Sequence, residues 1–356
     1  MSEKLRGAQR RPLSIFVDTD TGCDDAIALA WLLRHPKARV IGLTTVFGNS
    51  SVQNTTANLL TLLAALDSSL PVTMGASAPL VYPRTGVGAL MHGPDGLWGA
   101  QVAHDLESMG QGAPGAIAAA ARANPGLTLI ALGPLTNIAR AVQAYPENLA
   151  GVRMVVLAGA HGAGSITPAA EFNAFADPHA LQIVLDSQLQ VELITRDAFQ
   201  SLLLDSAMPA RLALECGKAG QLLARVLDGY GQAVRHHGGT LSVPDAAAVI
   251  YALYPQLGVA APATVRVVMD GELTRGQTIV ALSQRHQAAL ALGTSGVERL
   301  ASNSGDPSFD YAAALREASA RAPHNAQVVL QIDAEAMAEL LEEGLMALGV
   351  ERAVGG

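Results

Sequence analysis

Four carboxylates stand close together near the beginning of the chain, directly after an apolar run. Residues 13–17 read LSIFV, and Asp18, Asp20, Asp24 and Asp25 follow within eight residues. The apolar run is typical of a buried parallel strand. Because side chains alternate along a strand, Asp18 and Asp20 leave its carboxyl end on the same side. Four negative charges this close repel one another unless a cation is bound or a proton is shared, so the acids predict a site for a hard ion such as Ca²⁺ or Mg²⁺.

A simpler interpretation is that these acids cap a helix and solvate a loop. Gly22 permits a tight turn, and Asp24 and Asp25 open an apolar helix at its positive end. Their position argues against capping alone, because open α/β sheets bind ligands at the carboxyl ends of their strands.

Strand-like and helix-like segments alternate through most of the chain, which predicts βαβ units and an α/β fold with a mostly parallel open sheet flanked by helices. The expected strands are 13–17, 39–46, 127–132, 152–158, 190–195, 263–268 and 277–282, with a closing strand and helix within 327–348. The expected helices include 52–66 and 135–144, and 199–260 is predicted to be mainly helical. No linker is visible, so we expect a flexible tail at 1–11 and one domain at 12–350.

Composition narrows the classes of function. The net charge of −8, from 23 basic and 31 acidic residues, argues against a nucleic-acid partner. Two cysteines, Cys23 and Cys216, make no disulfide framework and favour a reducing, cytoplasmic location. No stretch is long and apolar enough to span a membrane, and residues 1–11 lack the apolar core of a signal peptide.

Polar groups also follow other predicted strands or begin a later helix. The segments are TTVFGN at 44–49, LGPLTN at 132–137, SITPAAEFN at 165–173 and PDAAAV at 244–249. Each is weak evidence alone, because Asn is common in turns and Asp245 also fits a helix N-cap. Right-handed crossovers place the loops that follow parallel strands along one edge of the sheet, so most of these groups are expected to converge there.

Together these segments resemble one family. DTDTGCDD at 18–25, HGPDGLWG at 92–99, TRGQT at 274–278 and the four segments above occur in the order found in nucleoside hydrolases, the inosine/uridine-preferring N-ribohydrolases. The resemblance covers about residues 13–348. It implies a Rossmann-like nucleoside hydrolase fold, a homodimer or homotetramer, and hydrolysis of the N-glycosidic bond of ribonucleosides to ribose and free base.

The matching positions imply a role for each residue. The expected Ca²⁺ ligands are Asp20, Asp25, Asp245 and the carbonyl of Leu132. Asp20 also resembles the base that activates the Ca²⁺-bound water. The expected ribose-binding groups are Asp24, Asn49, Glu171 and Asn173, of which Asn173 is also expected to act in catalysis, while Asp18 supports the loop. These roles suit the chemistry, because carboxylates stabilise the positive charge that develops on the sugar.

Two positions depart from the family pattern. Pro244 stands where a histidine often protonates the leaving base, and Ser165 stands where many members carry Asn near the ribose 5′-hydroxyl. We expect His236 or His237, on a Gly-flanked loop at 236–244, to serve as the acid, unless base expulsion relies on solvent. His92 is expected to face the nucleobase, whose identity stays open.

Two other functions fit parts of the sequence. A haloacid-dehalogenase-type phosphatase also begins with a strand and DxD, but Gly22 stands where that pattern has Thr or Val, and Lys is scarce. A nucleoside- or ribose-binding relative that lost catalysis is suggested by Pro244 and opposed by the retained acids.

Overall fold

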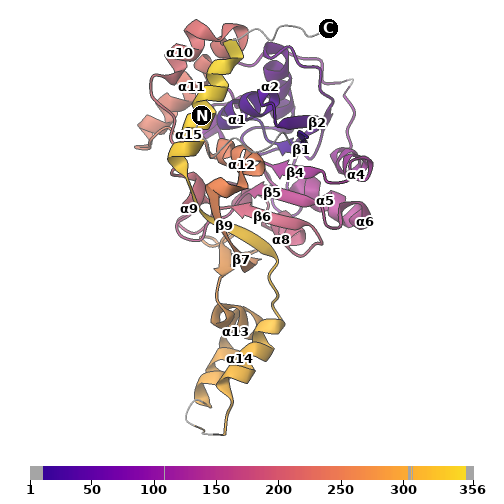
Figure 1. Cartoon of the computed structure of the whole chain (residues 1–356), viewed down its shortest axis with the longest axis vertical. Coiled ribbons are helices and arrows are strands. Elements are labelled where there is room, and N and C mark those ends of the chain that lie inside the picture. Colours follow the sequence, from indigo (N-terminus) through magenta and orange to yellow (C-terminus); the bar gives the residue numbers. More distant parts are fainter. Residues whose placement is uncertain (1–10, 108, 304–305, 307, 350–356) are drawn as a thin grey trace.

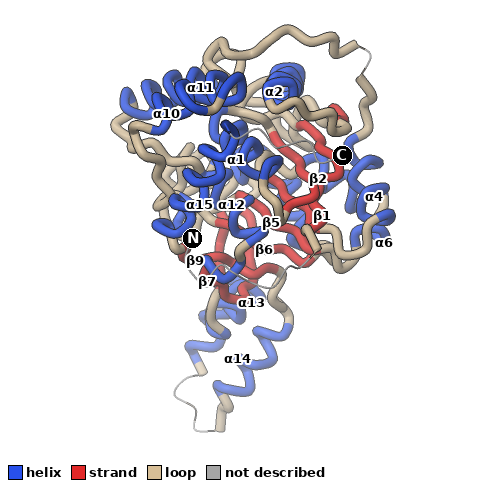
Figure 2. The backbone as a smooth tube through the Cα atoms, turned by 45° about the horizontal axis from the view of Figure 1, so that its top comes forward, coloured by secondary structure: helices blue, strands red, loops and turns tan. Residues whose placement is uncertain are grey.

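The computed structural model describes residues 11–349 apart from 108, 304–305 and 307, so the tail predicted for 1–11 falls almost entirely outside the described residues. A nine-stranded sheet runs through the molecule, drawn red in Figure 2. The strands are β1 (Leu13–Thr19), β2 (Ala38–Thr45), β3 (Val72–Met74), β4 (Thr128–Ala131), β5 (Arg153–Leu157), β6 (Gln190–Ile194), β7 (Gly258–Val267), β8 (Thr278–Ala281) and β9 (Ala326–Ile332).

The sheet is mostly parallel, as the sequence predicted. The strand order is β3-β2-β1-β4-β5-β6-β9-β7-β8. Strands β1 to β6 and β9 pair in parallel, whereas β7 pairs antiparallel with both β8 and β9. The carboxyl ends of β1, β4, β5 and β6 therefore lie side by side at one edge, which is where ligands bind in sheets of this kind.

Helices cover both faces of the sheet. The helices before β6 are α1 (Cys23–Arg34), α2 (Val52–Ala65), α3 (Ala89–His92), α4 (Ala113–Ala123), α5 (Thr136–Ala144), α6 (Pro146–Leu149), α7 (Phe172–Ala176) and α8 (Pro178–Leu185). Those after β6 are α9 (Arg196–Phe199), α10 (Met208–Glu215), α11 (Gly217–His236), α12 (Pro244–Leu253), α13 (Gln284–Ser302), α14 (Tyr311–Ala320) and α15 (Ala334–Met346), with short 3₁₀ turns at Pro255–Leu257 and Ala347–Gly349.

Two apolar clusters hold the helices to the sheet. One contains Trp31 of α1, Ile250 of α12 and Leu341 of α15, and the other contains Ile138 of α5 and Leu181 of α8. Figure 1 shows the corresponding helix layers on opposite sides of the strands. Burial on both faces explains the runs of consecutive apolar residues in the parallel strands, such as residues 15–17 of β1 and 154–157 of β5.

Most strands and helices lie where the sequence predicts them, with three differences. Strand β3 is only three residues long and was not anticipated. Strand β7 begins at Gly258, earlier than the predicted 263–268. Helices α13 and α14 form a pair that projects from the rest of the fold (Figure 1), in a region for which no element was predicted.

Three further predictions concern the helical region 199–260, the number of domains and membrane-spanning segments. The mainly helical character of 199–260 is confirmed by α10, α11 and α12. The single domain predicted for 12–350 stays a prediction. Among the described helices, none has both the length and the apolarity needed to cross a bilayer.

Candidate active site

The acids that follow β1 are buried at the carboxyl edge of the sheet. The chain leaves β1 at Asp20, turns at Gly22 and enters α1 at Cys23. The first turn of α1 carries Asp24 and Asp25, where the positive end of the helix dipole favours carboxylates. The amide of Gly22 donates to Asp25 Oδ2 at 2.9 Å, so this acid also caps the helix. Capping is therefore one role of the acids, but it does not explain the burial of all of them.

Asp20 is held by backbone that approaches it closely. The amide of Asn49 donates to Asp20 Oδ2 at 2.8 Å. A Cβ atom at Gly48 would overlap the same oxygen, and one at Gly133 would lie 2.7 Å from Asp20 Oδ1. Only glycine leaves room for this carboxylate, so the chain after β2 and the chain after β4 both fix its position.

A second group of oxygens suits a cation. Asp24, Asp25 and Asp245 each offer one carboxylate oxygen, and these oxygens all lie within 4.8 Å of one another. Asp245 reaches this point from the first turn of α12. Asp24 Oδ1 is buried without a hydrogen-bond partner, which is costly unless a ligand completes it. The donors are all oxygen, as a hard divalent cation requires.

The electrostatics of the cluster also favour a bound cation. Burial, followed by the charges of neighbouring acids, raises the pKa of Asp20 and of Asp245 well above the usual range. Burial raises the pKa of Asp24, and burial together with the charge of Asp24 raises the pKa of Asp25 to about 6. The residues therefore fit a cation, whose charge would relieve this repulsion.

The structure places Asp24 among the candidate metal oxygens, whereas the sequence assigned it to the ribose. Asp20 lies beside this group, since the charges of Asp25 and Asp24 both raise its pKa. The carbonyl of Leu132 accepts a 2.6 Å hydrogen bond from Asn173 Nδ2. That bond holds Asn173 of α7 against the chain that follows β4.

Glu171 and Asn173 form a second set of polar groups. Glu171 caps α7 and accepts from the amides of Gly159 (2.8 Å), Asn173 (3.0 Å) and Ala174 (3.1 Å). Burial nevertheless raises the pKa of Glu171 to about 7. Asn173 Nδ2 also donates to the carbonyl of Leu157 at 2.8 Å, while its Oδ1 is buried without a partner. These contacts hold the two side chains rigid and leave acceptor capacity for a ligand hydroxyl.

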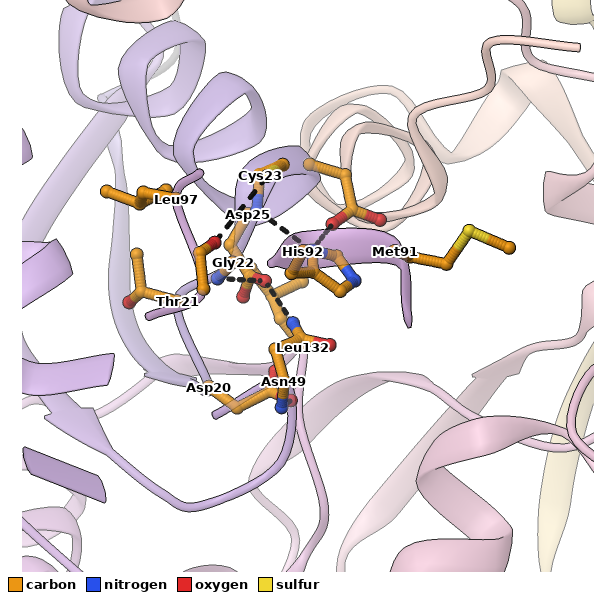
Figure 3. A network of polar contacts seen from close by, with 12 residues as sticks. Asp20, Thr21, Gly22, Cys23, Asp25, Asn49, Met91, His92, Leu97 and Leu132 are labelled. Atoms are coloured by element: carbon orange, nitrogen blue, oxygen red, sulfur yellow. Dashed lines mark hydrogen bonds and ion pairs between the residues drawn. The ribbon is translucent and has the colours of Figure 1, made fainter. Parts of the chain in front are cut away.

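His92 comes from α3 and meets the start of α1 (Figure 3). Its Nδ1 accepts from the amide of Cys23 at 3.1 Å, so the proton of the neutral ring sits on Nε2. Burial lowers the pKa of His92 to about 4. The ring stacks on Tyr230 of α11, with centroids 5.5 Å apart. His92 is thus a neutral hydrogen-bond donor.

Asn49 joins the same arrangement from the chain after β2. Its Nδ2 donates to Asp25 Oδ2 at 3.0 Å, as the dashed line in Figure 3 shows. The remaining oxygen of Asp25, Oδ1, accepts from the Thr19 hydroxyl at 2.5 Å. Asp18 lies one layer deeper, where its Oδ1 accepts from Thr44 Oγ1 at 2.5 Å and Asn137 Nδ2 at 2.8 Å. Asp18 therefore joins the end of β1 to β2 and to the start of α5, and its support of the loop stays a prediction.

A cavity of about 620 Å³ opens over these groups. The sequence-predicted residues that line it are Asp20, Asp24, Asn49, His92, Leu132, Ser165, Glu171, Asn173 and Asp245. Asp25 lies fully buried among them. Pro244 also lines the cavity, at the start of α12.

His236 and His237 do not line the cavity. His236 is the last residue of α11, not part of a loop, and His237 follows it as the C-cap. Both side chains are exposed. The helix continues to His236 because its apolar positions pack on the core, and this leaves the end of the helix in solvent.

Sequence reasoning missed several lining residues. Tyr230 and Val234 are four residues apart on α11 and both face the cavity. Arg196, Thr240 and Ser242 also line it. The spacing of the apolar residues on α11 predicts a buried helix face. A face that packs on the core and a face that lines a cavity have the same period, so the sequence pattern does not distinguish them.

The fold and site define a class: an α/β protein with an oxygen-only cation cluster beside a pocket rich in groups that bind hydroxyls. Comparison with known proteins makes the class specific. A sequence model of the inosine-uridine preferring nucleoside hydrolases matches residues 15–339. The chain belongs to this family and is a nucleoside N-ribohydrolase.

Individual proteins similar to this chain are also named as nucleoside hydrolases. The chain is 37% identical over 272 residues to the non-specific ribonucleoside hydrolase RihC of Escherichia coli O139:H28, covering 75% of this chain and 88% of the relative. It is 35% identical over 297 residues to RihC of Escherichia fergusonii, covering 81% and 96%. Among solved structures, a plant nucleoside hydrolase, PpNRh1, superposes with a TM-score of 0.76 at 26% identity, covering 94% of this chain and 99% of the other. The purine-preferring ribonucleoside hydrolase of Gardnerella vaginalis shares the fold, with a TM-score of 0.78 at 24% identity, covering 94% of this chain and 99% of the other.

Proposed function

We propose that the enzyme hydrolyses the N-glycosidic bond of ribonucleosides in a Ca²⁺-dependent reaction, with Asp20 as general base. The proposed ligands are Asp20, Asp25, Asp245 and the Leu132 carbonyl, and the geometry adds Asp24 as a further candidate. The observation that carries the proposal is the buried all-oxygen cluster at the bottom of a cavity lined by Glu171 and Asn173. When bound, the cation would supply positive charge that orients the ribose diol and the attacking water.

The other residues of the site have three roles in the proposed reaction: they accept a proton, bind the ribose hydroxyls and stabilise positive charge. Asp20 accepts the proton of the water that attacks C1′, since its carboxylate is held at the cavity wall by the Asn49 amide. Asn49, Glu171 and Asn173 bind ribose hydroxyls, with Asp24 shared between the sugar and the cation. The nearby carboxylates stabilise the positive charge that develops on the sugar ring.

We assign contact with the departing base to His92 and Tyr230 in place of His236 and His237. The two residues line the cavity as a stacked pair, and Pro244, which also lines the cavity, has no proton to give. Burial and the charges of Asp24 and Cys23 raise the pKa of Tyr230 well above its usual range, so it stays a neutral donor.

A direct assay tests the function. Inosine, adenosine, uridine and cytidine are incubated separately with the protein, and ribose reducing ends are measured before and after treatment with a Ca²⁺ chelator. We expect ribose release that stops on chelation and returns with added Ca²⁺, and the four rates give the base preference. Tight nucleoside binding without ribose release would support the non-catalytic alternative. Full activity after exhaustive chelation would exclude the cation.

Two further expectations are part of the proposal. The buried free thiols of Cys23 and Cys216 suit a reducing compartment, so we propose a cytoplasmic enzyme. We also propose a homodimer or homotetramer, which sedimentation can test.

A further inference from the structure

We propose that the turn between β7 and β8 is a positioning device for the ribose-binding segment 159–173, and that Thr278 is its central positioning residue. The inference rests on the ribose-binding role proposed above for Glu171 and Asn173. Thr278 is the first residue of β8 and is 5% exposed. It does not line the cavity, so any effect on the reaction must pass through its neighbours.

Thr278 makes both backbone hydrogen bonds of one residue in that segment. Its hydroxyl donates to the carbonyl of Ala160 at 2.7 Å and accepts from the amide of Ala160 at 2.9 Å. Segment 159–171 has no strand or helix of its own, so a side chain supplies the pairing that a neighbouring strand would otherwise provide.

The residue before Ala160, Gly159, is a hydrogen-bond donor to Glu171. The amide of Gly159 donates to Glu171 Oε2 at 2.8 Å. Gly159 also packs against Thr278, because a Cβ at Gly159 would lie 2.9 Å from the Thr278 methyl and hydroxyl. A shift of Ala160 therefore moves one of the three amides that hold the Glu171 carboxylate.

The same turn also holds α7, which carries Asn173. The Arg275 guanidinium lies 4.0 Å from the ring centroid of Phe175 and 4.3 Å from that of Tyr82. Gly276 adopts φ +82°, and a Cβ there would lie 2.5 Å from Phe175 Cα. The carbonyl of Leu273 accepts from Thr167 Oγ1 at 3.1 Å. The turn thus contacts segment 159–175 at several points outside the cavity.

Such support is needed because α7 has only five residues. A helix this short does not hold its position by its own hydrogen bonds. Displacement of the ribose-binding groups by about 1 Å is enough to cost about 10²-fold in rate. The turn therefore contributes to catalysis through geometry, without touching the substrate.

The chain offers a matched control in the same hairpin. Thr264 of β7 is 1% exposed, and its hydroxyl lies 2.7 Å from the carbonyl of Ala322 and 3.0 Å from that of Pro323. Thr264→Val and Thr278→Val remove the same hydroxyl with the same change of shape, at opposite ends of the β7–β8 pairing. Thr278→Ser keeps the hydroxyl and serves as the rescue variant.

The first measurement is steady-state kinetics with the best nucleoside substrate. We expect Thr278→Val to lower kcat/KM by about 10²-fold, mostly in kcat, because ribose contacts strengthen in the transition state. Thr278→Ser should return to within about threefold of the parent, and Thr264→Val should stay near the parent value. Equal losses in both valine variants, or no loss in Thr278→Val, would overturn the proposal.

The second measurement is amide hydrogen exchange, which does not depend on activity. Thr278→Val should speed exchange at Gly159 and Ala160 by about tenfold, as expected for one lost hydrogen bond, while Thr264→Val leaves these amides unchanged. Unchanged exchange at 159–173 in Thr278→Val would refute the positioning role. If the parent protein cleaves no nucleoside, the proposed function fails, while this measurement still decides whether Thr278 holds the segment.

Discussion

The two halves of the cavity are built in different ways. The acidic half is buried and consists of Asp20, Asp24, Asp245, Glu171 and Asn173. Backbone amides and carbonyls hydrogen-bond three of these side chains, those of Asp20, Glu171 and Asn173. The helical half, Met91, His92, Tyr230 and Val234, is provided by side chains of α3 and α11 that pack against one another. Backbone contacts fix atoms closely and tolerate little change, whereas side-chain packing between helices accommodates substitutions of similar volume. We infer that the acidic half performs the ribose chemistry and that the helical half adapts to the base.

The largest expected effect tests the acidic half. Asp20→Asn keeps the size of the side chain and an oxygen that can accept from the Asn49 amide, but it cannot take a proton. We expect kcat to fall by about 10³-fold on every nucleoside, as for loss of a general base. Initial-rate assays measure this. Asp310→Asn, at the cap of the distant α14, is the control and should leave kcat unchanged. A loss in Asp20→Asn that is below about tenfold, or confined to one base, would break the division between the halves.

The next effect tests the helical half. Tyr230→Phe removes one hydroxyl and should lower kcat on natural nucleosides by about 10²-fold, as for loss of one hydrogen-bond donor to the charge that develops on the leaving base. The same variant should change little with p-nitrophenyl riboside, whose leaving group needs no proton. His236→Ala and His237→Ala are the controls, because both side chains are exposed outside the cavity. A nucleoside-specific loss in a histidine variant, with none in Tyr230→Phe, would restore the histidines as the acid.

The smallest effect concerns pH. Burial raises the pKa of Glu171 to about 7, so its carboxylate form is depleted below that pH. If the carboxylate accepts a ribose hydroxyl, protonation of Glu171 should add a fall in kcat/KM of about tenfold per unit below pH 7. His92 adds no step between pH 5 and 8, because burial lowers its pKa to about 4. A pH–rate profile of the parent and of Glu171→Gln measures this, and an unchanged profile in the variant would remove Glu171 from that role.

The same shift has a consequence for stability. A carboxyl group whose pKa is higher in the folded state than in the unfolded state favours folding least when it is ionised. The contribution of Glu171 to the free energy of unfolding therefore declines as pH rises from its ordinary value of 4.5 towards 7.

Much of the fold and of the acidic half could be predicted from the sequence. Asp20, Asp24 and Asp25 lie at a strand end and in the next helix turn, and strand alternation with the helix dipole fixes their directions locally. Glu171 and Asn173 were found through a family motif. The end of α11 at His236 was not predicted, because helix period alone does not give the position of a helix end.

Local sequence is sufficient to predict where the carboxylates leave the backbone, because that depends on residues within one strand, one turn and one helix start. The groups that surround the carboxylates come from the packing of distant segments. Asp245 reaches the cluster because α12 packs on α1, Tyr230 faces His92 because α11 packs on α3, and Thr278 hydrogen-bonds Ala160 because β8 begins beside the loop after β5. Such contacts join segments far apart in the chain, and their geometry follows from packing of whole helices and strands, which local residue patterns do not encode.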